Sequence, residues 1–229
     1  MIIFANNHYS ICEIMKKFAV ILCGSGSLDG SEIYESVMTL LAIDKNGCSY
    51  TIFAPNENQY QVINHISKKP MHETRNMMIE ASRIARGEIQ DLKKYKAENF
   101  DALIFPGGNG SAKNLFTYNL DGLNAKVLPE VERAIKSTFL LKKPIGALCI
   151  APVLLAKVLG DITITIGSDP KTIADIEKMG ATHINTQQTE VIADKKNRIF
   201  TTPCFMLPAS VSDIAESADK LIKSILNNE

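Results

Sequence analysis

Short apolar runs alternate with amphipathic segments along almost the whole chain, and this alternation restricts the possible folds more than any other feature. Apolar runs typical of strands that are buried on both faces stand at 18–23, 49–55, 101–108 and 144–149. Segments with apolar residues at helical spacing stand at 31–47, 128–143, 150–159, 169–180 and 208–226. The alternation predicts an α/β fold with an open, mostly parallel sheet and helices on both faces.

Three further segments complete this prediction. ITITIG (162–167) alternates like a strand, and 189–194 with 198–203 indicate a hairpin around DKKN. Residues 73–88 suggest a loop that enters a short helix. In open sheets of this kind, functional sites lie at the carboxyl ends of the strands, so the segments that follow the strands are the candidates for chemistry.

Charge and hydropathy exclude several classes of partner. Lys and Arg number 25, as do Asp and Glu, so the net charge is zero and no basic surface for nucleic acid is indicated. No apolar run reaches the roughly 18 residues of a membrane span. We therefore expect no nucleic-acid partner and no membrane insertion.

The five cysteines form no disulfide or zinc pattern. Their number is odd, their spacing is wide and no C-x-x-C pair occurs. Thiols without such a framework favour a reducing compartment, and we expect a cytoplasmic protein. Residues 1–14 precede the first predicted strand and make a poor signal peptide. We interpret them as an extension without function, which a misassigned start codon would explain.

The stretch KPIGALCIAPVLLAKVL places Cys149 between an apolar strand and a helix, where the backbone must turn sharply. This arrangement is typical of a nucleophile elbow, which presents a reactive side chain outside the packed layer. N–H groups at the start of the helix favour a thiolate and predict a lowered thiol pKa. From the residues alone, a small cysteine that only fills the core remains the alternative.

The glycines of FPGGNGSAKN end another buried strand at the same edge of the predicted sheet. Backbone N–H groups at Gly107 and Gly108 could form an oxyanion hole together with the N–H of Ile150. The segment lacks the Lys-Ser/Thr of a phosphate-binding P-loop. A plain tight turn is the simpler interpretation.

The segment LDGSEIYE begins the first predicted helix and contains three carboxylates. Asp29 with Glu32 three residues later predicts a capping box, which gives Glu32 a structural role. Glu35 lies away from the apolar face that Ile33, Val37, Leu40 and Leu41 define. It could act as an acid/base for the thiol or be an ordinary solvated glutamate.

The histidines give little support to a metal site. No pair of the four has the spacing of metal ligands, so we expect neither a metal nor another cofactor. His183 precedes the predicted hairpin and could approach Cys149 in space as an auxiliary group. A single loop histidine is more often structural.

Several segments together resemble one superfamily. AVILCGSGSLDGSEIYE, LIFPGGNGSAKNL and KPIGALCIAP resemble the ThiJ/PfpI superfamily, which includes the Parkinsonism-associated deglycase. INHISKKPMHETRNMMIEASRIARGEI and RIFTTPCFML are similar to its sigma-cross-reacting, ElbB-type branch of isoprenoid biosynthesis glyoxalases. The resemblance runs from about Met15 to the C-terminus.

The resemblance implies one domain over 15–229 with a flavodoxin-like, class I glutamine amidotransferase-like sandwich. It implies that Cys149 is a nucleophile hydrogen-bonded to Glu35, and that the N–H groups of Gly108 and Ile150 form the oxyanion hole. His183 matches a superfamily histidine only loosely. The resemblance also implies a homodimer.

One departure from the superfamily restricts the chemistry. Protease-like members carry histidine directly after the cysteine, where this chain has Ile150, and the late His-x-Glu pair of glutamine amidotransferases does not occur. Amide hydrolysis therefore lacks its general base. The resemblance then implies a glutathione-independent glyoxalase III-type enzyme that acts on a small reactive dicarbonyl, methylglyoxal or glyoxal. A redox-sensing or ligand-binding protein with an oxidisable cysteine and a deglycase remain the alternatives.

Overall fold

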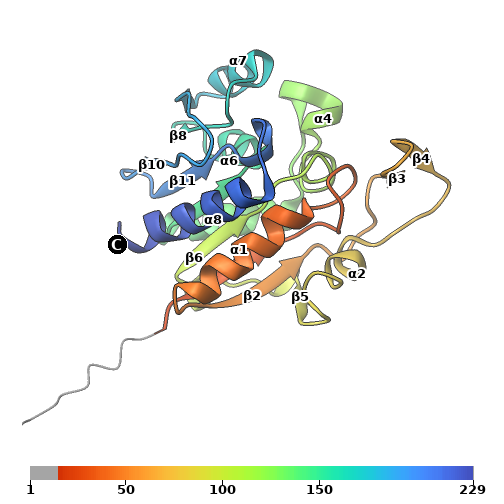
Figure 1. Ribbon diagram of the computed structural model, residues 1–229, viewed down its shortest axis with the longest axis horizontal. Coiled ribbons are helices and arrows are strands. Elements are labelled where there is room, and N and C mark those ends of the chain that lie inside the picture. Colours follow the sequence, from red (N-terminus) through yellow and green to blue (C-terminus); the bar gives the residue numbers. More distant parts are fainter. Residues whose placement is uncertain (1–14, 229) are drawn as a thin grey trace, which may run out of the picture.

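Residues 15–228 are described by a computed structural model, in which seven strands form one central sheet (Figure 1). The strand order is β10-β11-β7-β6-β1-β2-β5. In chain order the strands are β1 (Lys17–Ile21), β2 (Ser49–Ala54), β5 (Ile89–Asp91), β6 (Ala102–Phe105), β7 (Ile145–Leu148), β10 (Ile192–Asp194) and β11 (Ile199–Thr202). All neighbours pair in parallel except β10 and β11, which form the predicted hairpin.

Eight α-helices are found in the described part of the chain. They are α1 (Ile33–Lys45), α2 (Met77–Ala81), α3 (Ser111–Asn114), α4 (Tyr118–Asp121), α5 (Pro129–Leu140), α6 (Pro152–Leu159), α7 (Pro170–Lys178) and α8 (Val211–Leu226).

The remaining elements are short. Four 3₁₀ turns are η1 (Leu92–Lys94), η2 (Ala97–Asn99), η3 (Gly122–Asn124) and η4 (Cys204–Met206). Two small sheets stand apart from the central one, formed by β3 (Val62–Asn64) with β4 (Lys69–Met71), and by β8 (Thr163–Ile164) with β9 (Thr182–His183).

Helices cover both faces of the central sheet, as the sequence predicts. α1 and α8 contact one another and lie in front of the sheet in Figure 1, whereas α6 lies behind it. α5 contacts α6, β6 and β7. The central strands are apolar throughout because both of their faces are buried; residues 18–21 of β1, for example, have no exposed surface. The predicted flavodoxin-like, class I glutamine amidotransferase-like sandwich is confirmed.

The segment 162–167 differs from its prediction as a strand of the main sheet. Only Thr163–Ile164 is a strand, and it pairs with β9 outside the central sheet. The place beside β7 is already taken by β11, which pairs with β7 directly. The chain instead bends at Gly167, whose φ is +89°.

The buried face of α1 is not the one that its apolar residues suggest. Ile33, Val37 and Leu41 are 43%, 41% and 44% exposed. Glu35, together with Ser36 and Thr39, is fully buried instead. The interpretation of Glu35 as a solvated glutamate is therefore wrong, because α1 turns a polar side toward the carboxyl edge of the sheet.

The start of α1 also differs from the predicted capping box. Glu32 is itself the N-cap, and its carboxylate accepts a hydrogen bond from the N–H of Glu35 at 2.7 Å. The Asp29 carboxylate accepts from the N–H of Ile63 at 2.7 Å. Asp29 therefore holds the β3–β4 hairpin to the loop before α1 rather than capping the helix.

Two sequence expectations concern the ends of the chain and membranes. The predicted extension at 1–14 lies outside the described residues. Among residues 15–228, no helix combines the length and the apolar composition that crossing a bilayer requires.

Candidate active site

Cys149 lies at the carboxyl end of β7, in the turn that leads to α6. Its N–H donates to the carbonyl of Thr202 on β11 at 3.0 Å, which continues the β7–β11 ladder by one residue. Its φ is +60°, a left-handed conformation that is uncommon for a side chain other than glycine. Strain of this kind is concentrated at functional positions. The geometry is that of the predicted nucleophile elbow.

Glu35 reaches the same point from α1. Its carboxylate oxygen Oε2 accepts a hydrogen bond from the N–H of Gly107 at 2.8 Å. Its other oxygen, Oε1, is buried without a hydrogen-bond partner at normal geometry. The Cys149 thiol and the N–H of Phe205 nevertheless lie close enough to lower the Glu35 pKa. The carboxyl group is thus fixed through Oε2, and it interacts with the Cys149 thiol.

Gly107 makes this approach possible. A Cβ at this position would lie 2.6 Å from the Cβ of Cys149, 2.8 Å from the carbonyl oxygen of Leu148 and 2.9 Å from Oε2 of Glu35. These distances are too short for any side chain. The first glycine of the PGG turn therefore lets the thiol and the carboxyl group meet, a role that the sequence analysis did not assign to it.

We expect Gly107→Ala to reduce activity by about 10²-fold, because the new methyl group must displace Cys149 or Glu35. The measurement is turnover per folded molecule, with folding checked by circular dichroism. Gly47→Ala is the control: Gly47 has a φ of +70° and open space around it, so alanine strains the backbone there without touching the site. Full turnover by a folded Gly107→Ala protein would contradict this role.

The two predicted oxyanion-hole groups lie beside the sulfur. The N–H groups of Gly108 and Ile150 make hydrogen bonds to Cys149 that lower its pKa. Gly108 has a φ of +105°, and a Cβ there would lie 2.6 Å from the backbone nitrogen of Glu32. The structure therefore brings Cys149, Glu35, Gly108 and Ile150 together.

Burial dominates the electrostatics of this pair. Burial raises the pKa of the Cys149 thiol well above its ordinary value, and the negative charge of Glu35 raises it further. Burial, followed by the charge of Glu32, raises the pKa of Glu35 to about 7. The lowered thiol pKa expected from the helix start is thus wrong, because the two N–H groups do not offset burial. Near neutral pH the pair is suited to share a proton, with Glu35 as the base for the thiol.

Cys204 is a further thiol in this buried cluster. It begins η4 after β11, has a φ of +43° and has no exposed surface. Burial raises its pKa well above the ordinary value, and the charges of Glu35 and Cys149 raise it further. The Cys23 thiol makes a hydrogen bond with the Ser31 hydroxyl group. Burial raises the pKa of Cys23 to about 12, and Cys149 does not contribute to this shift.

His183 does not join the site through any hydrogen bond. It lies in β9, and its Nε2 accepts from the N–H of Ile166 at 3.3 Å. Burial lowers its pKa, and the charge that opposes this effect belongs to Glu177. Within residues 15–228, no group of three or more His, Cys, Asp or Glu side chains is arranged to hold a metal ion.

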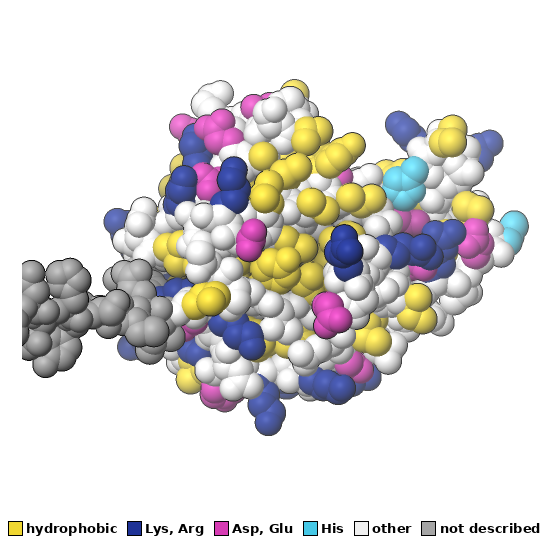
Figure 2. All heavy atoms as spheres, turned by 60° about the horizontal axis from the view of Figure 1, so that its bottom comes forward, with side chains coloured by type: hydrophobic (Ala, Val, Ile, Leu, Met, Phe, Trp, Pro, Cys, Tyr) yellow, Lys and Arg dark blue, Asp and Glu magenta, His cyan; other side chains and the backbone are white. Residues whose placement is uncertain are grey.

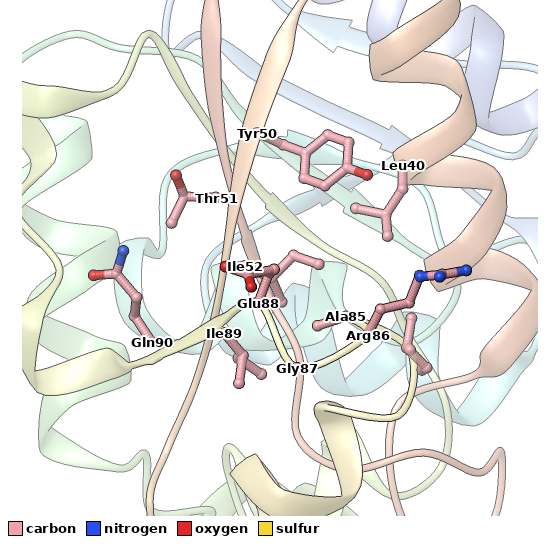
Figure 3. A pocket seen from close by; sticks show the side chains of 11 residues that line it. Leu40, Tyr50, Thr51, Ile52, Ala85, Arg86, Gly87, Glu88, Ile89 and Gln90 are labelled. Atoms are coloured by element: carbon pink, nitrogen blue, oxygen red, sulfur yellow. The ribbon is translucent and has the colours of Figure 1, made fainter.

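A cavity of about 560 Å³ lies away from this cluster, beside the edge strand β5. Figure 3 shows Leu40 of α1, Tyr50 of β2 and Arg86 of the turn before β5 around it. None of the predicted site residues lines it. Cys149 itself is only 7% exposed.

Comparison with known proteins identifies relatives over most of the chain. The DJ-1/PfpI family matches residues 19–203. The human "glutamine amidotransferase-like class 1 domain-containing protein 3, mitochondrial" is 39% identical, over 96% of this chain and 85% of that protein. The "ES1 protein, mitochondrial" of Danio rerio is 37% identical, over 82% of this chain and 76% of that protein.

These names correct the expected location. The curated relatives, including the "ES1 protein homolog, mitochondrial" of Rattus norvegicus, are named mitochondrial, which contradicts the prediction of a cytoplasmic protein. The absence of a disulfide pattern indicates reducing conditions only, and such conditions are not unique to the cytoplasm. The step from cysteine usage to one compartment was therefore wrong.

Solved structures agree with the fold and the family. The isoprenoid biosynthesis protein with an amidotransferase-like domain from Ehrlichia chaffeensis has a TM-score of 0.86 and 37% identity, covering 92% of this chain and 99% of that one. Glyoxalase III from Candida albicans has a TM-score of 0.61 at 14% identity, covering 93% and 97%, and shares the fold alone. The elbow cysteine, the extent of the family match and these relatives lead to one conclusion: the chain belongs to the DJ-1/PfpI family.

Proposed function

We propose that the protein is a glutathione-independent glyoxalase that converts methylglyoxal to lactate or glyoxal to glycolate. The observation that carries the proposal is the contact between the Cys149 thiol and the buried Glu35 carboxyl group, with the N–H groups of Gly108 and Ile150 at the sulfur. A thiol, an acid/base group and two N–H donors are sufficient for attack on an electrophilic carbonyl.

The reaction starts with proton transfer from the Cys149 thiol to the Glu35 carboxylate. The sulfur then bonds to the aldehyde carbon, and the carbonyl oxygen takes the proton back from Glu35 to give a hemithioacetal, which leaves Glu35 as the carboxylate again. Glu35 removes the hydrogen from that carbon and returns a proton to the neighbouring carbon through an enediol. The product is a thioester of the 2-hydroxy acid. Water cleaves the thioester, which releases the acid and restores the thiol.

The low exposure of Cys149 supports a small substrate. A dicarbonyl of two or three carbons can reach a thiol that is 7% exposed more easily than a glycated protein side chain can. This observation favours a glyoxalase over a deglycase. The test is lactate formation from methylglyoxal by metal-free protein without glutathione. If a folded protein forms no lactate but its Cys149 is selectively oxidised by peroxide, the redox-sensing alternative takes its place.

We also propose that the protein is a homodimer that buries the outer side of α1. Ile33, Tyr34, Val37 and Leu41 are all more than 40% exposed there. The Phe205 ring lies 6.4 Å from that of Tyr34 and extends the apolar surface. Figure 2 shows apolar side chains gathered near the middle of one face of the molecule. A twofold pair of α1 helices would cover this surface with a second copy of itself.

We expect Val37→Glu combined with Leu41→Glu to convert a dimer into a monomer, because each carboxylate would be buried unpaired at the interface. Size-exclusion chromatography with light scattering gives the mass directly. Ile79→Glu, at a position on α2 that is 60% exposed, is the matched control and should leave the mass unchanged. A monomeric wild type, or an unchanged mass of the double variant, would rule out this interface.

A further inference from the structure

A second cavity lies at the opposite end of the sheet from Cys149. It has a volume of about 390 Å³, between the end of α5 and the turn that joins β10 to β11. The N–H of Ile145, at the start of β7, donates to the carbonyl of Arg198 in its wall at 3.0 Å. Cys149 follows the other end of β7, so this cavity is separate from the proposed active site.

The charged side chains that line this cavity are all cationic. They are Lys142, Lys195, Lys196 and Arg198. Of these, Lys196 alone has an ion-pair partner among the described residues, the 94% exposed Asp161 at 3.6 Å. Such exposed pairs contribute little. The four charges therefore remain available to an anion.

The nearest acid in the turn is already engaged. The Asp194 carboxylate accepts hydrogen bonds from the N–H of Thr163 at 2.8 Å and from the backbone and side chain of Asn197 at 3.1 and 2.8 Å. These bonds fix the shape of the turn. They also direct the Asp194 carboxylate to neutral donors rather than to the lysines of the cavity.

Arg198 contributes a guanidinium group to the wall of this cavity. Guanidinium groups are well matched to phosphate oxygens.

Apart from Asn197, the rest of the wall is apolar. Phe139 and Leu140, at the end of α5, line the cavity, and Leu140 is 79% exposed. An exposed leucine beside a cationic cluster suits a molecule with a hydrocarbon part and an anionic head. The volume is within the range of small-molecule sites.

We propose that this cavity binds a small organic phosphate that carries a short hydrocarbon group. The phosphate contacts Arg198 and the lysines of the turn, and the hydrocarbon packs on Phe139 and Leu140. Four cations without a lining carboxylate favour a doubly charged phosphate over a singly charged carboxylate. The proposal does not depend on the proposed glyoxalase activity, because no residue is shared with the Cys149 site.

The test is isothermal titration of the full chain with hexyl phosphate, inorganic phosphate and hexanol. We expect hexyl phosphate to bind at least about tenfold more tightly than inorganic phosphate, since each buried methylene group contributes roughly fourfold. Hexanol should not bind measurably. Equal affinity for the two phosphates would overturn the role of Phe139 and Leu140, and with it the proposal.

Lys195→Gln combined with Lys196→Gln should weaken hexyl phosphate binding by about tenfold or more, because two charge-assisted contacts are lost. The matched control is Lys68→Gln with Lys69→Gln, which removes two exposed lysines from the β3–β4 hairpin. Equal weakening by both pairs would show a nonspecific charge effect and overturn the proposal. The circular dichroism spectra and thermal unfolding of both variants should match those of the wild type, which confirms that they are folded.

Discussion

Cys149→Ala is expected to lower lactate formation from methylglyoxal by at least about 10³-fold, because the thiol that forms the thioester is removed. The thiol sits between two N–H donors and the Glu35 carboxyl group, and alanine retains none of these interactions. The measurement is enzymatic detection of D- and L-lactate by metal-free protein in the absence of glutathione.

Cys48→Ala is the matched control for this variant. Cys48 is also a buried cysteine, 8% exposed, but it precedes β2 at the amino end of the sheet. The control should keep full activity. Lactate formation that survives Cys149→Ala would show that the elbow thiol is not the nucleophile, and the proposed mechanism would be abandoned.

Glu35→Gln is expected to lower activity by about 10²–10⁴-fold, the range for a general acid/base. The glutamine oxygen can still accept the hydrogen bond from Gly107, so the variant removes proton transfer and leaves the shape of the site. Glu98→Gln, on the exposed surface, is the control. Activity within a few-fold of the wild type would eliminate Glu35 as the proton shuttle.

The same variant has a pH-dependent effect on stability. In the unfolded chain a glutamate titrates near 4.5, whereas Glu35 in the folded protein holds its proton up to about pH 7. The folded state therefore binds more protons between these values, and the free energy of unfolding falls as pH rises through this window. The full fall is on the order of 3 kcal/mol at 1.36 kcal/mol per pKa unit.

Glu35→Gln should abolish this fall. Urea unfolding at pH 5 and pH 8 measures it: wild type loses stability between the two, and the variant changes by much less. Its stability relative to wild type should therefore be greater at pH 8 than at pH 5. Identical pH profiles for the two proteins would mean that Glu35 is not protonated in the folded state over this range.

The elbow could be located from the sequence because local chain properties define it. The apolar run of β7, the cysteine and the Pro152 that begins α6 are adjacent in the chain, and each has a conformational preference that can be predicted locally. The PGG turn was recognised for the same reason. The segment 162–167 was misplaced because a strand-like pattern does not say which sheet position is free.

The sequence by itself determined most of the strands and helices, the mostly parallel sheet and the position of Cys149, since burial on both faces requires apolar runs and a sharp turn requires particular residues. It did not indicate the edge strand β5. Only the tertiary structure decided which side of α1 is buried. Glu35 is held by Gly107, 72 residues away in the chain, and the space for that contact exists only because Gly107 lacks a Cβ. Because α1 delivers a carboxyl group to a distant turn, it buries Glu35, Ser36 and Thr39 beside Leu40 and Ile43. Ile33, Val37 and Leu41 are left on the surface.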